Sequence, residues 1–315
     1  MLQLQVYMVG DPIQLPATVM SKRAVEANYQ QSLFKRLQDA GYPVHVLKVQ
    51  YRMNPIISRF ASDTFYEGKI EDGPNVVTGT RMPYHKHGAL GPIAFYHVKG
   101  EEYNPEGSAS IRNDEECDMV IALVKCLIAQ VCPMLILHCH PRLHRKLRHR
   151  EVLVSDMSRE VTRGRMQHAP LGQEPLIGII SPYKAQVKAI QGRLAAALPS
   201  ASERIDVNTI DGFQGREKDV IIFSTVRTSL GKKNRIGFVA DERRVNVGLT
   251  RARCSLLVVG QRRVLQHDEN WEALLHFVSE QGCASHKGGC SLDATWQARS
   301  KLLCMADFAC SCVKR

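Results

Sequence analysis

The chain has 315 residues, 44% of them hydrophobic and 23% charged, which is typical of a soluble globular protein with one large domain or two smaller ones. Its net charge of +11 favours an anionic partner such as nucleic acid, although a basic composition alone is weak grounds for one. The sequence contains neither an apolar run of eighteen residues nor a secretory leader, so we expect no membrane span and reduced thiols at its ten cysteines.

Apolar and β-branched runs predict strands at intervals along the chain. These are Leu4–Val9, Val44–Val49, Ile93–Val98, Leu176–Ile180, Val220–Ser224 and Ser255–Gly260. Helical patterns lie between several of them. They cover Gln31–Ala40, a segment capped by Asn113, Tyr183–Leu198 and Arg243–Arg253. Short strands alternating with helices predict an α/β fold with a mostly parallel sheet flanked by helices, whose loops at the carboxyl ends of the strands carry function.

Two regions lack a helical or strand period. Residues 131–175 contain the basic run Arg142–Arg150, which can be a nuclear signal, an RNA-binding arm or part of an unstructured insert. The tail, residues 281–315, carries five cysteines whose spacing matches no zinc pattern. His286 beside Cys283 keeps a metal site open, but we favour free thiols in a disordered tail and expect no metal site.

Two polar motifs follow the first two predicted strands. In Gly10-Asp-Pro-Ile-Gln-Leu-Pro16, Gln14 would stand at the carboxyl end of a strand, where an amide can hydrogen-bond a phosphate oxygen or an attacking water. A solvated glutamine in a proline-rich loop is the alternative. Gln50-Tyr-Arg-Met-Asn-Pro55 opens a helix with proline near its start. Arg52 can neutralise phosphate oxygens there, while Tyr51 can stack on a base or, more simply, fill the core.

A third motif, Ser181-Pro-Tyr-Lys-Ala-Gln186, connects a predicted strand to a helix. Backbone amides at a helix N-terminus attract phosphates, and Tyr183 and Lys184 add a stacking surface and a charge. An ordinary turn with a capping serine is an equally good interpretation.

The fourth motif lies in Val207–Val220. Its turn glycines, Gly212 and Gly215, permit a ligand to approach the backbone closely. Glu217 can accept a hydrogen bond from a ribose hydroxyl, and Thr209 can contact a nucleic-acid phosphate. A purely structural loop is the alternative.

Arginines follow in Asp241–Arg253. Arg244 and Arg251 are seven residues apart, about two helical turns, so a continuous helix would place them on one face together with Arg253. A cationic helix face is usually solvated, but the intervening residues are apolar, so we expect this face to meet a cleft.

Features of a complete nucleotide motor are also missing from this sequence. No Gly-x-x-x-x-Gly-Lys-Ser/Thr loop occurs, and no strand ends in a paired acidic box. Asp114-Glu-Glu begins a predicted helix, and Asp241-Glu precedes another. Phosphoryl transfer by a P-loop enzyme needs the loop to grip phosphate and the carboxylates to hold magnesium.

In order, these segments resemble the later motifs of superfamily 1 RNA/DNA helicases, closest to the senataxin-like branch. The matching segments are Gly10-Asp-Pro-Ile-Gln-Leu-Pro16, Val49-Gln-Tyr-Arg-Met-Asn-Pro55, Phe65-Tyr-Glu-Gly-Lys69, Gly178-Ile-Ile-Ser-Pro-Tyr183, Asp211-Gly-Phe-Gln-Gly-Arg-Glu217 and Asn246-Val-Gly-Leu-Thr-Arg-Ala-Arg253. The resemblance covers about residues 4–130 and 175–280. Gly248 stands where relatives commonly carry alanine, and we expect that change to matter little.

The resemblance implies a pair of RecA-like domains of the P-loop NTPase superfamily, which clamp ATP and Mg²⁺ between them and step along single-stranded RNA or DNA. It implies that Gln14 senses the γ-phosphate and that Arg52 and Arg251 act as arginine fingers. The implied nucleotide-binding residues are Tyr51, Gly215 and Glu217. The implied nucleic-acid-binding residues are Ser181, Pro182, Tyr183 and Thr209.

By this resemblance, residues 1–40 would be a remnant strand and Gln14 loop of the first domain with a connecting helix, and residues 41–280 the second domain with the insert 131–175. Three interpretations remain open. We favour a helicase fragment without autonomous ATPase activity. The others are a non-catalytic nucleic-acid-binding or regulatory module, and a motor completed in trans by a separate first domain. The family also implies an RNA or RNA/DNA-hybrid partner and a nuclear location.

Overall fold

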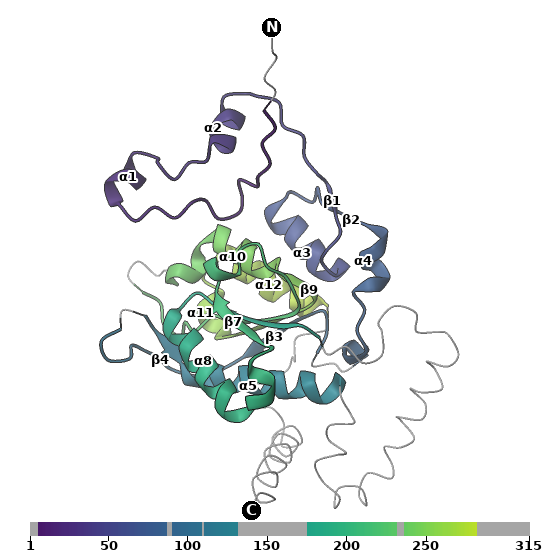
Figure 1. The fold of residues 1–315 in the computed structure, drawn as a ribbon, viewed down its shortest axis with the longest axis vertical. Helices are drawn as coiled ribbons and strands as arrows, with labels where there is room; N and C mark the ends of the chain where they lie inside the picture. Colours follow the sequence, from purple (N-terminus) through teal and green to yellow (C-terminus); the bar gives the residue numbers. More distant parts are fainter. Residues whose placement is uncertain (1–5, 87–89, 109, 132–174, 232–235, 282–315) are drawn as a thin grey trace, which may run out of the picture.

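The computed structural model describes residues 6–86, 90–108, 110–131, 175–231 and 236–281 (Figure 1). The basic run Arg142–Arg150 and the tail cysteines therefore lie outside the described residues, as do nearly all of the predicted insert and the first two residues of the predicted strand Leu4–Val9.

A five-stranded sheet forms the centre of the protein, and all of its strands are parallel. In spatial order the strands are β3 (Ile93–His97), β9 (Ala252–Gly260), β8 (Lys218–Ser224), β6 (Ile177–Ser181) and β7 (Asp206–Thr209). This confirms the predicted α/β class with a parallel sheet. Four of these strands were predicted within a few residues of their bounds; β7 was not.

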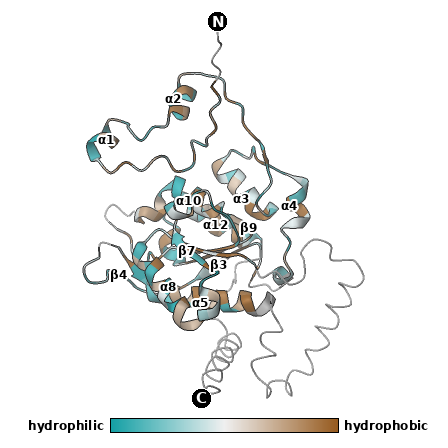
Figure 2. Cartoon of the chain, in the orientation of Figure 1, coloured by the Kyte–Doolittle hydropathy of each residue, from teal (hydrophilic) through white to brown (hydrophobic). Residues whose placement is uncertain are grey.

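Helices cover both faces of the sheet (Figure 1). The helices α5 (Asp114–Val131), α8 (Lys184–Ala197) and the short α9 (Pro199–Ser202) lie on one face. On the other face lie α3 (Pro55–Phe65), α10 (Glu242–Leu249), α11 (Arg262–Leu265) and α12 (Glu269–Glu280). Strand β8 shows the alternation that this layering requires, because Val220 and Ile222 pack against the first layer and Ile221 and Phe223 against the second. Hydrophobic residues accordingly run along the strands (Figure 2).

Smaller elements surround this core. A short parallel pair, β1 (Val49–Gln50) and β2 (Glu71–Asp72), is followed by α4 (Pro74–Gly79) and the 3₁₀ turn η1 (Pro83–Lys86). An antiparallel pair joins β4 (Glu102–Tyr103) to β5 (Arg112–Asn113). Two further 3₁₀ turns, η2 (Asp211–Phe213) and η4 (Gly237–Ala240), lie in the loops that follow the strands.

The N-terminal arm, residues 16–48, extends away from the sheet (Figure 1). Its short helices α1 (Lys22–Glu26) and α2 (Leu33–Asp39) begin at capping serines and bury no residue. The predicted strand Leu4–Val9 was wrong over its described part, since residues 6–9 are irregular, and the strand predicted at Val44–Val49 forms only at its last residue. A strand needs a neighbouring strand for its backbone hydrogen bonds, and in the segment Val44–Val49 the described residues supply one only at Val49, which pairs with Glu71 of β2.

The helix predicted at Arg243–Arg253 also needs correction. The helix α10 starts at Glu242, one residue before the predicted start, with the carboxylate of Asp241 as its cap, but it ends at Leu249. Arg251 lies in the turn that follows, and Arg253 is already part of β9. The argument that a continuous helix places these arginines on one face was therefore wrong. Arg253 is exposed and pairs with Asp219 at 3.3 Å, outside the cluster described next.

Candidate functional site

The side chain of Arg251 is a buried cation. Arg251 is 4% exposed. Its Nε donates to the carbonyl of Val247 at 2.9 Å, and its Nη2 donates to Gln14 Oε1 at 3.2 Å. No carboxylate of the described residues forms an ion pair with it. Desolvation lowers the pKa of Arg251, and the neighbouring charge of Arg52 lowers it further.

Arg52 lies beside Arg251 in the loop between β1 and α3. Its Nε donates to Glu217 Oε2 at 2.5 Å, and its Nη1 reaches the carbonyl of Thr250 at 3.4 Å. Gln50 fixes this loop, because its Oε1 accepts the backbone N–H of Arg52 at 2.8 Å. The structure therefore joins three of the predicted residues, Arg52, Arg251 and Glu217, although their motifs are far apart in the sequence.

The Gln14 loop is held onto this arrangement by hydrogen bonds. Asp11 Oδ2 accepts from Gln14 Nε2 and from the hydroxyl of Tyr66, each at 2.8 Å. Asn246 Nδ2 donates to the same hydroxyl at 3.0 Å and to the carbonyl of Ile13 at 3.2 Å. Burial raises the pKa of Tyr66 to about 12. The loop is thus oriented by Tyr66, which directly follows α3, and by Asn246 of α10.

Sequence reasoning did not assign a role to Tyr66, Asn246 or Asp11. Each of them lies inside a motif that carried the helicase resemblance, so the motif boundaries were a usable signal. What could not be read from the sequence is that one tyrosine hydroxyl joins all three segments. We refer to Gln14, Arg52, Glu217, Arg251 and these three residues as the arginine cluster.

The other two predicted nucleotide-binding residues, Tyr51 and Gly215, lie one or two residues from members of the cluster in the sequence but form none of the hydrogen bonds described above. Tyr51 is 64% exposed, which corrects the expectation that it fills the core. Its ring lies against Gly73, where an added Cβ would come within 2.4 Å of it, so a larger residue at this position would displace the ring. Gly215 has a φ of +76°, a backbone conformation that favours glycine, and open space beside its Cα.

The predicted nucleic-acid-binding residues fall into two groups. Ser181 and Tyr183 are buried, and burial raises the pKa of Tyr183 to about 12. Pro182 and Thr209 are partly exposed. The Thr209 hydroxyl accepts the backbone N–H of Gly212 at 3.3 Å, so it caps the turn η2 as well as facing solvent in part.

A buried carboxylate lies beneath the carboxyl end of β8. Glu116 Oε2 accepts from the Ser224 hydroxyl at 2.7 Å and from the backbone N–H of Val226 at 2.9 Å. Val226 has a φ of +70°, which is rare for a β-branched residue, so these contacts hold a strained turn. Burial raises the pKa of Glu116 to about 7. The sequence predicted only that an acidic run begins this helix.

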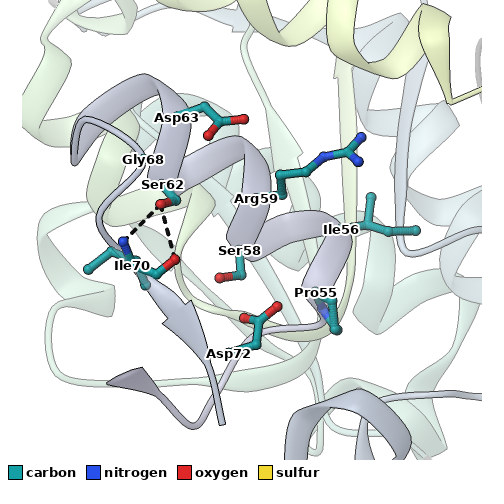
Figure 3. Close-up of a pocket in the computed structure, with 9 residues that line it drawn as sticks. All are labelled: Pro55, Ile56, Ser58, Arg59, Ser62, Asp63, Gly68, Ile70 and Asp72. Atoms are coloured by element: carbon teal, nitrogen blue, oxygen red, sulfur yellow. Dashed lines mark hydrogen bonds between the residues drawn. The ribbon is translucent and has the colours of Figure 1, made fainter. Parts of the chain in front are cut away.

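A separate open hollow of about 410 Å³ lies along α3 (Figure 3). Its lining mixes Arg59 with the carboxylates of Asp63 and Asp72, and Ser62 Oγ accepts the backbone N–H of Ile70 at 3.0 Å beside it. It includes no residue of the arginine cluster. We therefore build the site on the cluster and not on this hollow.

None of the helices in the described residues is both long and apolar enough to cross a membrane. The described part of the chain also brings together no group of three His, Cys, Asp or Glu side chains that could hold a metal ion.

Comparison with known proteins identifies the family to which the chain belongs. The AAA domain family matches residues 29–140 and 145–263. The chain is 39% identical to "Probable helicase MAGATAMA 3" of Arabidopsis thaliana, over 88% of this chain and 30% of that protein. It is 35% identical to "Helicase SEN1" of Saccharomyces cerevisiae, over 89% of this chain and 11% of that protein. It is 32% identical to "ATP-dependent helicase NAM7" of the same yeast, over 89% and 25%. The chain thus spans less than a third of each of these relatives.

Proposed function

The chain belongs to the AAA domain family and resembles superfamily 1 helicases over most of its length, and from this premise we propose that it forms the arginine-bearing wall of an ATP site in a helicase motor. In this proposal the chain corresponds to the second RecA-like domain, residues 41–280, together with the Gln14 loop. The motor would act on single-stranded RNA or DNA.

The observation that carries the proposal is the burial of Arg251 without a carboxylate partner among the described residues. A desolvated guanidinium loses water, and its hydrogen-bond acceptors here are the neutral groups of Val247, Gln14 and Thr250. The carboxylates of Glu217 and Asp11 offset this only as nearby charges, without an ion pair. Arg52 adds a second positive charge, which raises the cost further. A phosphate group placed between the two guanidinium groups would supply the missing negative charge and accept bidentate hydrogen bonds.

Glu217 is the carboxylate that pairs with Arg52 in the cluster. It holds Arg52 at 2.5 Å, but both side chains are substantially exposed, so the pair stabilises the fold by about 0–1 kcal/mol at most. Such a pair can be exchanged for a stronger one with a phosphate. In the proposal Arg52 turns to the phosphate, and Glu217 is then free to accept a hydrogen bond from ribose, with Gly215 leaving room beside it and Tyr51 at the rim.

The residues present fit the phosphates of ATP, and ATP supplies the γ-phosphate that Gln14, Arg52 and Arg251 would contact. The family uses Mg²⁺ as well, but no described residue is assigned to it. We further propose that the phosphate-gripping loop belongs to a first domain, either on a longer chain or in trans. On this proposal the 315-residue chain alone has no autonomous ATPase activity. The proposed location, the nucleus, rests on the family only.

The test compares Arg251→Gln with Arg253→Gln in the full chain, because Arg253 is a nearby arginine that is exposed and outside the cluster. Fluorescence anisotropy would measure the binding of a labelled, non-hydrolysable ATP analogue and of labelled ADP. We expect the wild type to prefer the triphosphate, and Arg251→Gln to weaken triphosphate binding roughly 10-fold or more through the loss of charged hydrogen bonds. The Arg253→Gln control should bind as the wild type does.

Equal affinity for the two nucleotides, unchanged in Arg251→Gln, would show that the cluster is not a phosphate site. It would favour the alternative, a nucleic-acid-binding or regulatory module without nucleotide. ATP hydrolysis in the presence of RNA is a separate readout. Appreciable turnover that Arg251→Ala abolishes would support the site but contradict the lack of autonomous activity.

A further inference from the structure

An exposed phenylalanine stands in a segment that is otherwise buried. In η4, Phe238 is 62% exposed, whereas its neighbours Ile236 and Val239 are buried in the core. Gly237 has a φ of +71°, which turns the chain between them. The indole N–H of Trp271 donates to the carbonyl of Val239 at 2.8 Å, so the segment that presents the ring is anchored. The exposure of Phe238 is therefore built into the fold.

The surroundings of this ring are aromatic and cationic. Arg244 places its guanidinium carbon 5.5 Å from the centre of the Phe238 ring, within the range of a cation–π contact. The ring of Tyr183 meets it edge to face, with centroids 6.4 Å apart and an interplanar angle of 68°. Tyr183 itself is only 7% exposed. The aromatic surface that solvent meets at this point is Phe238.

This position also connects the two segments predicted to contact nucleic acid. Arg244 pairs with Asp241 at 3.0 Å and reaches Asp211 at 3.7 Å, in the turn η2 that the hydroxyl of Thr209 caps. Phe238 and Arg244 thus bridge the Tyr183 segment after β6 and the Thr209 segment after β7. Both segments follow carboxyl ends of parallel strands, the edge where ligands of such sheets bind.

We propose that Phe238, with Arg244 beside it, is a stacking platform for an unpaired base of the nucleic acid. The inference rests on the proposed function for its partner and replaces Tyr183 with Phe238 as the residue that stacks. A nucleobase suits the platform because every base has a flat π-face, and an exposed aromatic ring next to an arginine is the surface on which unpaired bases stack. Arg244 is already oriented by two carboxylates, so little side-chain freedom is lost when a base binds.

The test uses the full chain and two labelled single-stranded probes of equal length and charge, an oligouridylate and an abasic oligonucleotide. Phe238→Ala should weaken binding of the base-bearing probe about 10-fold, since one stacked base contributes roughly that factor, and leave the abasic probe unchanged. Phe238→Trp should bind the base-bearing probe at least as well as the wild type. Tyr29→Ala is the matched control, because Tyr29 is also an exposed aromatic, at 79%, on the N-terminal arm, and it should change neither affinity.

Three results would overturn the inference. Unchanged binding of the base-bearing probe by Phe238→Ala would refute the platform while leaving nucleic-acid binding by the chain intact. An equal loss for both probes would assign Phe238 a structural role instead of stacking. Failure of the wild type to bind either probe would refute the nucleic-acid partner in the proposed function, and the platform with it.

Discussion

Tyr66 provides a direct test of how the Gln14 loop is held against the arginine cluster. Its hydroxyl donates to the carboxylate of Asp11 and accepts from the amide of Asn246, at 2.8 and 3.0 Å. Tyr66→Phe removes both hydrogen bonds and keeps the ring, which packs against the core. Asp11 is partly exposed and retains Gln14, whereas Asn246 is fully buried and retains the carbonyl of Ile13.

The expected magnitude follows from these contacts. A hydrogen bond to a charged group contributes about 1.5–3 kcal/mol and a neutral one about 1 kcal/mol, and water recovers part of the first at the partly exposed Asp11. We therefore expect the loop to lose about 2 kcal/mol of docking free energy, which corresponds to a roughly 30-fold increase in its open population.

Hydrogen–deuterium exchange of a peptide spanning residues 10–16 measures this population. Its reporters are the backbone N–H groups of Ile13 and Gln14, which are bonded to Asp11 at 3.0 and 3.2 Å. Exchange of these groups should accelerate in Tyr66→Phe, while peptides from β8 stay unchanged. Tyr84→Phe is the control, because Tyr84 is a buried tyrosine whose hydroxyl accepts a hydrogen bond from Ser255 and not from a residue of the Gln14 loop. Unchanged exchange of residues 10–16 in Tyr66→Phe would refute the docking role of the hydroxyl.

Two further predictions concern the core. Burial raises the pKa of Glu116 from 4.5 to about 7, so between these pH values the folded state binds more protons than the unfolded state. The free energy of unfolding should therefore fall by about 3 kcal/mol as the pH rises from 4.5 to 7. Denaturant titrations at pH 5 and 7.5 should show this fall in the wild type and not in Glu116→Gln. The same change in the free energy of unfolding in both proteins would contradict the prediction. Gly248→Ala should destabilise the fold by about 1–3 kcal/mol, because its Cβ would lie 2.4 Å from the buried ring of Phe223. A wild-type melting temperature would instead support the sequence-based expectation that alanine is tolerated there.

Much of the fold could be predicted because its signals are local. The strands β6, β8 and β9 are short apolar runs bounded by turns, and burial on both faces of a parallel sheet selects for such runs. The same signal failed at Leu4–Val9 and Val44–Val49, since an apolar run becomes a strand only where a neighbour accepts its hydrogen bonds. The end of α10 was missed for a similar reason: Arg251 leaves the helix to reach Gln14, a partner 237 residues away.

The candidate site was likewise predictable from the sequence in part. The sequence by itself determined the kinds of groups available, an amide in a loop and arginines in two motifs, and through their order it determined the family. Only the tertiary structure decided that Arg251 is buried without a carboxylate partner among the described residues, that Glu217 holds Arg52, and that Tyr66 joins three segments. It also decided that Tyr183 is covered and Phe238 is open. Burial and charge pairing depend on which distant residues meet, and residue type and spacing do not contain that information.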